Sequence, residues 1–234
     1  PSGRGQGDRR CPQRCRQDVL PGGYSEVIVV DTMEIRLSGF GGQGLIMASV
    51  VLARAASMYE SKHVVQKDDK YKREESGLYV VQTQTYGSGV RGGATKAEVK
   101  ISTKSINYPE ITIPDILVLM SEAAFQKYGG QTKRSTLVLI DPDTVSSRPE
   151  GKFCEIPATV IATESGNKIA ANMVMLGAVV AMSKIVHLDS IKSAIKDLLP
   201  AETLELNYRA LEKGYGLGTE RCEDGIVADW GDEH

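Results

Sequence analysis

A glycine-rich turn between an expected strand and an expected helix constrains the fold of this chain more than any other feature. Residues 39–44 read GFGGQG, which matches G-x-G-x-x-G; they follow the expected short strand 34–38 and open the helical pattern 43–58. In such a unit the first glycine permits a tight turn, the second lets a phosphate approach the backbone, and the third lets the helix pack against the strand. N–H groups at the helix start favour an anion. The pattern predicts a phosphate or pyrophosphate site, with a purely structural turn as the alternative.

The rest of the chain alternates between strand-like and helical patterns. Two continuously apolar runs, 116–120 and 137–140, are typical of strands buried on both faces of a sheet. The alternation predicts an α/β fold, a three-layer Rossmann-like domain, and an antiparallel hairpin over 79–102 makes its sheet mixed. The other expected strands are 63–66, 79–86, 95–102 and 160–162. The expected helices are 122–128, capped by Ser121, and 167–186. Two more helices are expected: one capped by Asp189 or Ser190 that ends before Pro200, and one over 203–213 that ends at Gly214.

Composition divides the chain into a lead-in, one domain and a tail. Residues 1–32 are basic and rich in glycine and proline, which is typical of a disordered or non-native segment. The domain is expected over 33–219 and the tail over 220–234. Within the domain, the segment 66–77 (QKDDKYKREESG) is dense in mixed charge. It favours a solvated surface loop, with a lid or a partner contact as the alternative.

Charge and hydropathy argue against two classes of partner. The net charge is -2 and aromatic residues make up 6% of the chain, so neither nucleic acid nor an anionic membrane is expected. The longest apolar stretch, 173–182, is well short of the ~20 residues that a bilayer span needs. The first thirty residues also lack the apolar region of a signal peptide. We therefore expect a cytoplasmic protein.

The cysteines do not have the spacing of a metal site. Cys11 and Cys15 enclose three residues, while Cys154 and Cys222 stand singly. Iron–sulfur and zinc sites use tighter, repeated spacings such as C-x-x-C. No metal site is expected, and electrons in any redox reaction should pass through another chain. No histidine has a convincing acid–base setting, so no catalytic residue is expected either.

A dinucleotide enzyme is an alternative interpretation of the turn. Such an enzyme places an acidic residue at the end of its second strand, about twenty residues after the glycines, where it binds the ribose. Here the expected second strand ends near Gln66, and Asp68 and Asp69 come late, inside the charged segment. A stand-alone Rossmann-type oxidoreductase that uses NAD(P) or FAD remains the alternative.

A second glycine-rich loop joins the two strands of the expected hairpin. Residues 86–93 read YGSGVRGG, which is longer than a minimal hairpin turn. Glycines let a ligand or another chain come close, and Arg91 offers a planar donor group suited to phosphate or carboxylate. The loop predicts an anion or subunit contact, against a flexible loop that carries an incidental arginine.

Two expected helices are apolar on nearly all sides. Residues 45–56 read LIMASVVLARAA and residues 169–182 read IAANMVMLGAVVAM. A helix without a polar face must be covered all round. We expect an extensive subunit interface at these helices, with wholly internal burial as the alternative.

Five segments occur in the order GFGGQG, VVQTQTYGSGVRGGATKAEVKIS, YPEITIPDILVLMSEAAFQKY, IPATVIA and NMVMLGA. Together they resemble the γ subunit of 2-oxoacid:ferredoxin oxidoreductases, with 2-oxoglutarate synthase the most similar branch, and the resemblance runs from about Met33 to Gly218. It identifies 33–219 as a pyruvate/ketoisovalerate oxidoreductase γ-type domain. The chain departs from the family by the charged insert, which stands between two VVQ triplets.

The resemblance implies oxidative decarboxylation of a 2-oxoacid with coenzyme A, which yields acyl-CoA, CO2 and reduced ferredoxin. It implies that thiamine diphosphate and [4Fe-4S] clusters lie on α-, β- and δ-type partner subunits. This chain would contribute coenzyme A binding and subunit contacts; a non-catalytic scaffold subunit is the further alternative. Residues carried over by motif are Gly39, Gly41, Gly42, Gln43 and Gly44 in the phosphate turn, Tyr86, Arg91, Gly92 and Gly93 in a loop that faces the α chain or the thiol cofactor, and Asn167 and Asn172 at a helix start near that interface.

Overall fold

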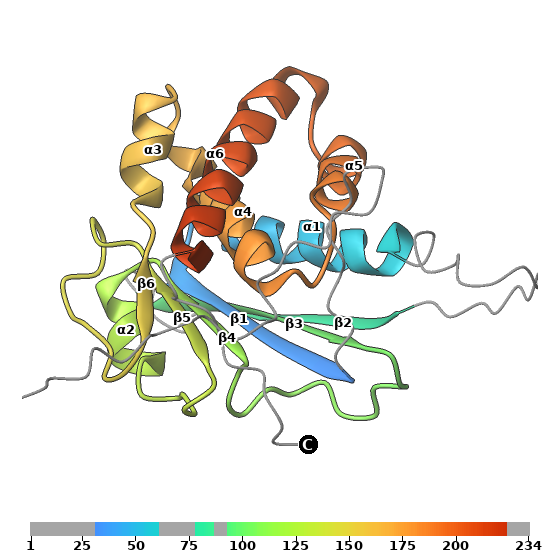
Figure 1. Ribbon diagram of the computed structural model, residues 1–234, viewed down its shortest axis with the longest axis vertical. Helices are drawn as coiled ribbons and strands as arrows, with labels where there is room; N and C mark the ends of the chain where they lie inside the picture. The colour runs from blue at the N-terminus through green and yellow to red at the C-terminus, as the bar shows by residue number, and fades with distance from the viewer. Residues whose placement is uncertain (1–30, 61–77, 87–92, 224–234) are drawn as a thin grey trace, which may run out of the picture.

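A computed structural model describes residues 31–60, 78–86 and 93–223. These residues build a six-stranded sheet of order β2-β3-β1-β4-β5-β6 (Figure 1). β3 is antiparallel to β1 and β2, whereas β4, β5 and β6 run parallel to β1. The expected α/β fold with a mixed sheet is confirmed. The strands are β1 (Thr32–Phe40), β2 (Tyr79–Thr85), β3 (Ala94–Ser102), β4 (Ile116–Leu119), β5 (Leu137–Ile140) and β6 (Phe153–Glu155).

Helices cover both faces of the sheet and complete three layers. Most of them lie on one face, while α2 covers the other face (Figure 1). β4 shows why both faces need a cover: Ile116 and Val118 belong to one apolar core, and Leu117 and Leu119 belong to the other. The helices are α1 (Leu45–Met58), α2 (Glu122–Tyr128), α3 (Ala158–Glu164), α4 (Ala171–Ser183), α5 (Leu188–Leu198) and α6 (Leu204–Glu223).

The apolar helix α4 is buried within the chain itself. Every residue from Ala171 to Ser183 is buried, because α6 packs along α4 while α1, α3 and α5 contact it from other sides. The expectation of a subunit interface at this helix was wrong. Wholly internal burial, the alternative, is what the structure has.

The expected end of the last helix at Gly214 was also wrong, since α6 continues to Glu223. A Cβ atom on Gly214 would collide with the backbone carbonyl of Val174, and one on Gly177 would collide with that of Leu211. These glycines let the backbones of α4 and α6 approach closely. Gly214 is therefore a packing residue in the helix interior, not a C-terminal stop.

Two further boundaries differ from expectation. Residues 160–162 lie in α3, not in a strand, because the buried carboxylate of Asp141 accepts hydrogen bonds from Thr159 N (3.0 Å) and Thr159 Oγ1 (2.6 Å) at the start of that helix. α5 has His187 at its N-cap position and no side-chain cap, so neither Asp189 nor Ser190 caps it. The expected strand 63–66 and the charged segment after it lie outside the described residues.

The expected cap of α2 is confirmed, whereas the expected domain limits are not tested. Ser121 accepts a hydrogen bond from Ala124 N at 3.1 Å and caps α2, as expected. The described part of the chain starts one residue before β1 and ends with α6, so the predicted domain limits at 33 and 219 remain predictions. None of the described helices has the length and apolar character needed to cross a membrane.

Candidate anion-binding site

The glycine turn lies at the point where the chain leaves two neighbouring strands toward opposite faces of the sheet. β1 and β4 are parallel neighbours, so their carboxyl ends meet at one edge of the sheet. The helix after β1 is part of one helical layer, and α2 after β4 is part of the other. In open α/β sheets, ligands bind outside the carboxyl ends of the strands at such a switch point.

The antiparallel strand β3 brings the described ends of the second glycine-rich segment to the same edge. Phe40 pairs with Ala94 and Gly39 pairs with Thr95, so β3 begins where β1 ends. β2 ends opposite Lys96, close to the same edge. The ends of the hairpin loop, Tyr86 and Gly93, therefore emerge beside the glycine turn.

The shape of the turn depends on two glycines with left-handed backbone. Gly42 has φ 91° and Gly44 has φ 72°, a region that side chains with a Cβ rarely adopt. Gly39, expected to make the tight turn, and Gly41 do not have positive φ. A Cβ on Gly41 would meet nothing nearer than Thr95 Oγ1 at 3.7 Å, so backbone there is open to a ligand.

The first turn of α1 is suited to an anion. Gly44 occupies the N-cap position without a side-chain cap, and the first intrahelical bond runs from Ala48 N to Gly44 O at 3.0 Å. Within the described residues, the N–H groups of residues 45–47 have no hydrogen-bond acceptor. These donors, together with the positive end of the helix dipole, can stabilise a phosphate oxygen.

Gln43 closes the turn on the side of the sheet. Its Oε1 atom accepts a hydrogen bond from Phe40 N at 2.6 Å, and its Nε2 atom donates to Met120 O at 2.7 Å. The side chain therefore links the end of β1 to the end of β4. The role of Met120 was missed by sequence analysis, because a backbone carbonyl has no side-chain signal.

Asn172 closes the turn on the side of the helices. It lies in the first turn of α4, is buried, and donates a hydrogen bond from Nδ2 to Gly44 O at 2.9 Å. A residue 128 positions away thus reaches the carbonyl that also begins α1. Asn172, expected at a helix start near a subunit or cofactor interface, thus makes a direct hydrogen bond to the glycine turn.

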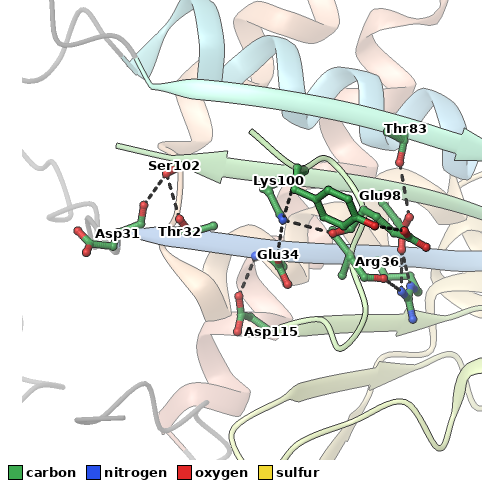
Figure 2. Close-up of polar contacts among 12 residues, drawn as sticks. Asp31, Thr32, Glu34, Arg36, Thr83, Glu98, Lys100, Ser102 and Asp115 are labelled. Atoms are coloured by element: carbon green, nitrogen blue, oxygen red, sulfur yellow. Dashed lines mark hydrogen bonds and ion pairs between the residues drawn. The ribbon is translucent and has the colours of Figure 1, made fainter. Parts of the chain in front are cut away.

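A buried charged network holds β3 against β1 on the face opposite α1 (Figure 2). Arg36 Nε donates to Glu98 Oε1 at 2.8 Å, and Lys96 pairs with Glu98 Oε2 at 2.9 Å. Arg36 also donates to the side chain of Gln131 and the carbonyl of Ile111. Its guanidinium is thus engaged within the chain, across the same strand pair in which Thr95 lies opposite Gly39.

Residues 71–217 match the family model described as pyruvate ferredoxin/flavodoxin oxidoreductase. The chain belongs to this family. It is 44% identical over 192 residues to the 2-oxoglutarate synthase subunit KorC of Methanocaldococcus jannaschii, a match that covers 80% of this chain and 94% of that protein. It is also 27% identical to the common γ subunit of the pyruvate/ketoisovalerate oxidoreductases of Pyrococcus furiosus, over 78% of this chain and 95% of that one.

A solved structure confirms the type of subunit. The keto/oxoacid ferredoxin oxidoreductase γ subunit of Geobacter sulfurreducens superimposes with a TM-score of 0.68 at 34% identity, covering 82% of this chain and 98% of that one. The resemblance inferred from the motifs is therefore confirmed. The chain is a γ-type subunit of a 2-oxoacid:ferredoxin oxidoreductase.

The structure places the family's motif residues unevenly. The five turn residues and Asn172 form one cluster at the edge of the sheet. Tyr86 is 66% exposed beside that cluster and Gly93 is partly exposed. Arg91 and Gly92 lie outside the described residues. Asn167 accepts a hydrogen bond from Ile169 N at 2.9 Å and caps the 3-10 turn Lys168–Ala170 before α4, with no described contact to the glycine turn.

The topology argues against a dinucleotide site in this γ-type subunit. A ribose-binding carboxylate belongs at the carboxyl end of a parallel strand beside β1. One neighbour of β1 in the sheet is β3. It runs antiparallel to β1, so its carboxyl end lies at the edge of the sheet opposite the glycine turn. The parallel neighbour β4 leads to Met120 and Ser121, which are not acidic, and the carboxylate of the following Glu122 accepts hydrogen bonds from Ser146 N and Ser147 N. No cluster of three potential metal ligands occurs among the residues that the structure describes, where Cys154 is buried.

Proposed function

We propose that this subunit binds the phosphate groups of coenzyme A for its complex and contacts the subunits that carry the other cofactors. The observation that carries the proposal is the junction of the glycine turn, the ends of the hairpin loop and Asn172 at one edge of the sheet. Coenzyme A bears a pyrophosphate and a ribose phosphate. Backbone N–H groups at a helix start and a guanidinium from the adjacent loop are the donors that such groups prefer.

The complex is proposed to oxidise 2-oxoglutarate with ferredoxin as acceptor and to release acyl-CoA and CO2. Support comes from the 44% identity to a 2-oxoglutarate synthase subunit. The choice of 2-oxoacid is proposed to lie on another subunit, because a relative in Pyrococcus furiosus is a subunit common to pyruvate and ketoisovalerate enzymes. Thiamine diphosphate on a partner supplies the decarboxylation chemistry, and iron–sulfur clusters on partners carry electrons.

The proposed partners are α-, β- and δ-type subunits of the same complex, with ferredoxin reached through it. A cytoplasmic location stays a prediction. The chain's own contribution is to bind and orient the thiol cofactor, which replaces a bimolecular encounter by a positioned one. No group of this chain is proposed to transfer a proton or an electron.

The test uses the reconstituted complex with coenzyme A and with pantetheine, which has the same thiol arm but no phosphate. Gly41→Ala places a methyl group in the open approach to the turn without a collision. We expect the KM for coenzyme A to rise about tenfold while activity with pantetheine is unchanged, as loss of a phosphate contact requires. We also expect coenzyme A to raise the melting temperature of the assembled complex. An unchanged KM together with no thermal shift would leave the scaffold interpretation standing.

A further inference from the structure

Both ends of the Gln43 carboxamide are engaged inside the protein. The acceptor Oε1 receives Phe40 N at 2.6 Å, and the donor Nε2 reaches Met120 O at 2.7 Å. A neutral side-chain amide has a carbonyl oxygen that accepts and an NH2 group that donates, and each has a backbone partner here: Phe40 N in the turn and Met120 O after β4. Because Phe40 N already has an acceptor, it is removed from the set of donors that a bound anion could use.

The glycines of the turn make room for carboxamides as much as for a ligand. A Cβ on Gly39 would collide with Gln43 Oε1 and would lie 2.7 Å from Leu45 Cδ1. A Cβ on Gly44 would collide with Asn172 Nδ2. Two glycines thus face two side-chain amides, and each amide holds one backbone group of the turn.

The two amides hold the turn from different layers of the fold. Gln43 ties it to the carboxyl end of β4 in the sheet, and Asn172 ties it to the buried helix α4. The left-handed backbone at Gly44 leaves its carbonyl shared between Asn172 Nδ2 and Ala48 N. The shape of the turn is therefore held by contacts within the protein, without a ligand.

We propose that Gln43 is a positioning residue, which pre-forms the turn through Phe40 and Met120 and does not itself contact coenzyme A. The motif alone suggests a direct contact, whereas the geometry commits both the carbonyl and the NH2 group of the Gln43 amide to backbone partners. The role depends on the proposed binding of coenzyme A at this turn. Under this proposal, the backbone N–H groups that bind the phosphate of coenzyme A are those of residues 45–47, in the first turn of α1. A pre-formed site lowers the ordering cost of binding, so losing the two bonds weakens binding without touching the reacting thiol.

The first experiment needs no variant. Hydrogen exchange of the Phe40 amide is followed in the full complex, with and without coenzyme A. We expect the same protection in both states, because the acceptor of that amide is Gln43. Protection that appears only when coenzyme A is added would overturn the proposal.

The second experiment compares Gln43→Met, which keeps the side-chain volume and removes both bonds, with Gln84→Met as a matched control on the exposed edge strand β2. For Gln43→Met we expect exchange at Phe40 to be about tenfold faster without ligand, and the KM for coenzyme A to rise about tenfold with kcat within about twofold. The KM for pantetheine should not change. The control should alter none of these values. Unchanged exchange at Phe40 with a raised KM would mean that Gln43 contacts coenzyme A directly, which would overturn the proposal.

Gly41→Ala separates the failure of this proposal from the failure of the proposed function. If Gly41→Ala raises the KM for coenzyme A and Gln43→Met does not, the site is real and the positioning role is wrong. If neither variant changes the KM although Phe40 exchanges faster in Gln43→Met, coenzyme A does not bind at this turn and both proposals fall. Failure of Gln43→Met to assemble leaves the exchange measurement on the unaltered complex as the deciding result.

Discussion

Because α4 and α6 pack closely, we expect replacement of glycine by alanine to have opposite effects on stability at two positions of α6. Gly214 and Gly216 both lie inside α6. A methyl group on Gly214 would collide with the carbonyl of Val174, whose Cα would lie 2.9 Å away. On Gly216 the same methyl group would meet no atom within 4 Å. Since alanine favours helix over glycine, local propensity alone predicts that both substitutions stabilise the chain.

The magnitudes follow from that geometry. Gly216→Ala should raise the free energy of unfolding by up to about 1 kcal/mol, the helix-propensity gain. Gly214→Ala gains the same amount but forces two backbones apart. Overpacking costs about 1–3 kcal/mol, and a backbone obstacle cannot rotate away, so we take the upper end. The net expected loss for Gly214→Ala is about 2 kcal/mol.

Thermal and urea denaturation of the full chain measure the difference. In a chain of this size, about 1 kcal/mol corresponds to a shift of about 2–4 °C in melting temperature. We expect Gly214→Ala to melt about 4–8 °C lower and Gly216→Ala to melt slightly higher than the unaltered chain. Melting shifts of the same sign in the two variants would refute the reasoning that helix contact, not propensity, decides the role of Gly214.

Two further predictions concern Arg91 in the second glycine-rich segment and Glu60, which follows α1. Arg91→Ala should raise the KM for coenzyme A without changing the iron content of the complex; an unaltered KM would remove Arg91 from the site. Burial raises the pKa of Glu60, but His187, with hydrogen bonds at 2.7 Å from its N and 2.9 Å from its Nδ1, together with the Ser190 hydroxyl, outweighs burial and leaves that pKa below its ordinary value. The charged form is therefore stabilised by folding, and this contribution is present above the unfolded pKa and lost as pH falls through the folded pKa. Glu60→Gln should lower the free energy of unfolding by about 1–3 kcal/mol at pH 7. Measured by urea unfolding, the difference in free energy between the variant and the unaltered chain should shrink toward pH 4. A difference that does not depend on pH would contradict the linkage.

The expectation about α4 was wrong for a reason that bears on the assembly. A helix without a polar face needs cover, and the covering element is α6, which approaches closely at Gly214 and Gly177. Subunit contacts, which remain a proposal, must therefore use other surfaces. Among the described residues near the turn, Phe40 and Met47 expose apolar side chains, with exposed fractions of 42% and 38%, in addition to Tyr86.

Local patterns in the sequence were sufficient for most elements of the fold. The apolar run 116–120 predicted a strand buried on both faces, and Ser121 predicted the cap of α2; both depend on neighbours only a few residues away. The motif residues 39–44 likewise predicted a turn between strand and helix, because glycine tolerance of left-handed backbone is a local property.

Contacts between distant residues decided the rest. The amino acid sequence determined the alternation of elements, the glycine turn and the family, since each depends on the order and spacing of nearby residues. Only the tertiary structure decided that Asn172 holds Gly44, that Asp141 starts α3, and that α6 passes Gly214 without stopping. The physical reason is that these hydrogen bonds and close approaches join residues far apart in the chain, so no local pattern contains them until the layers have packed.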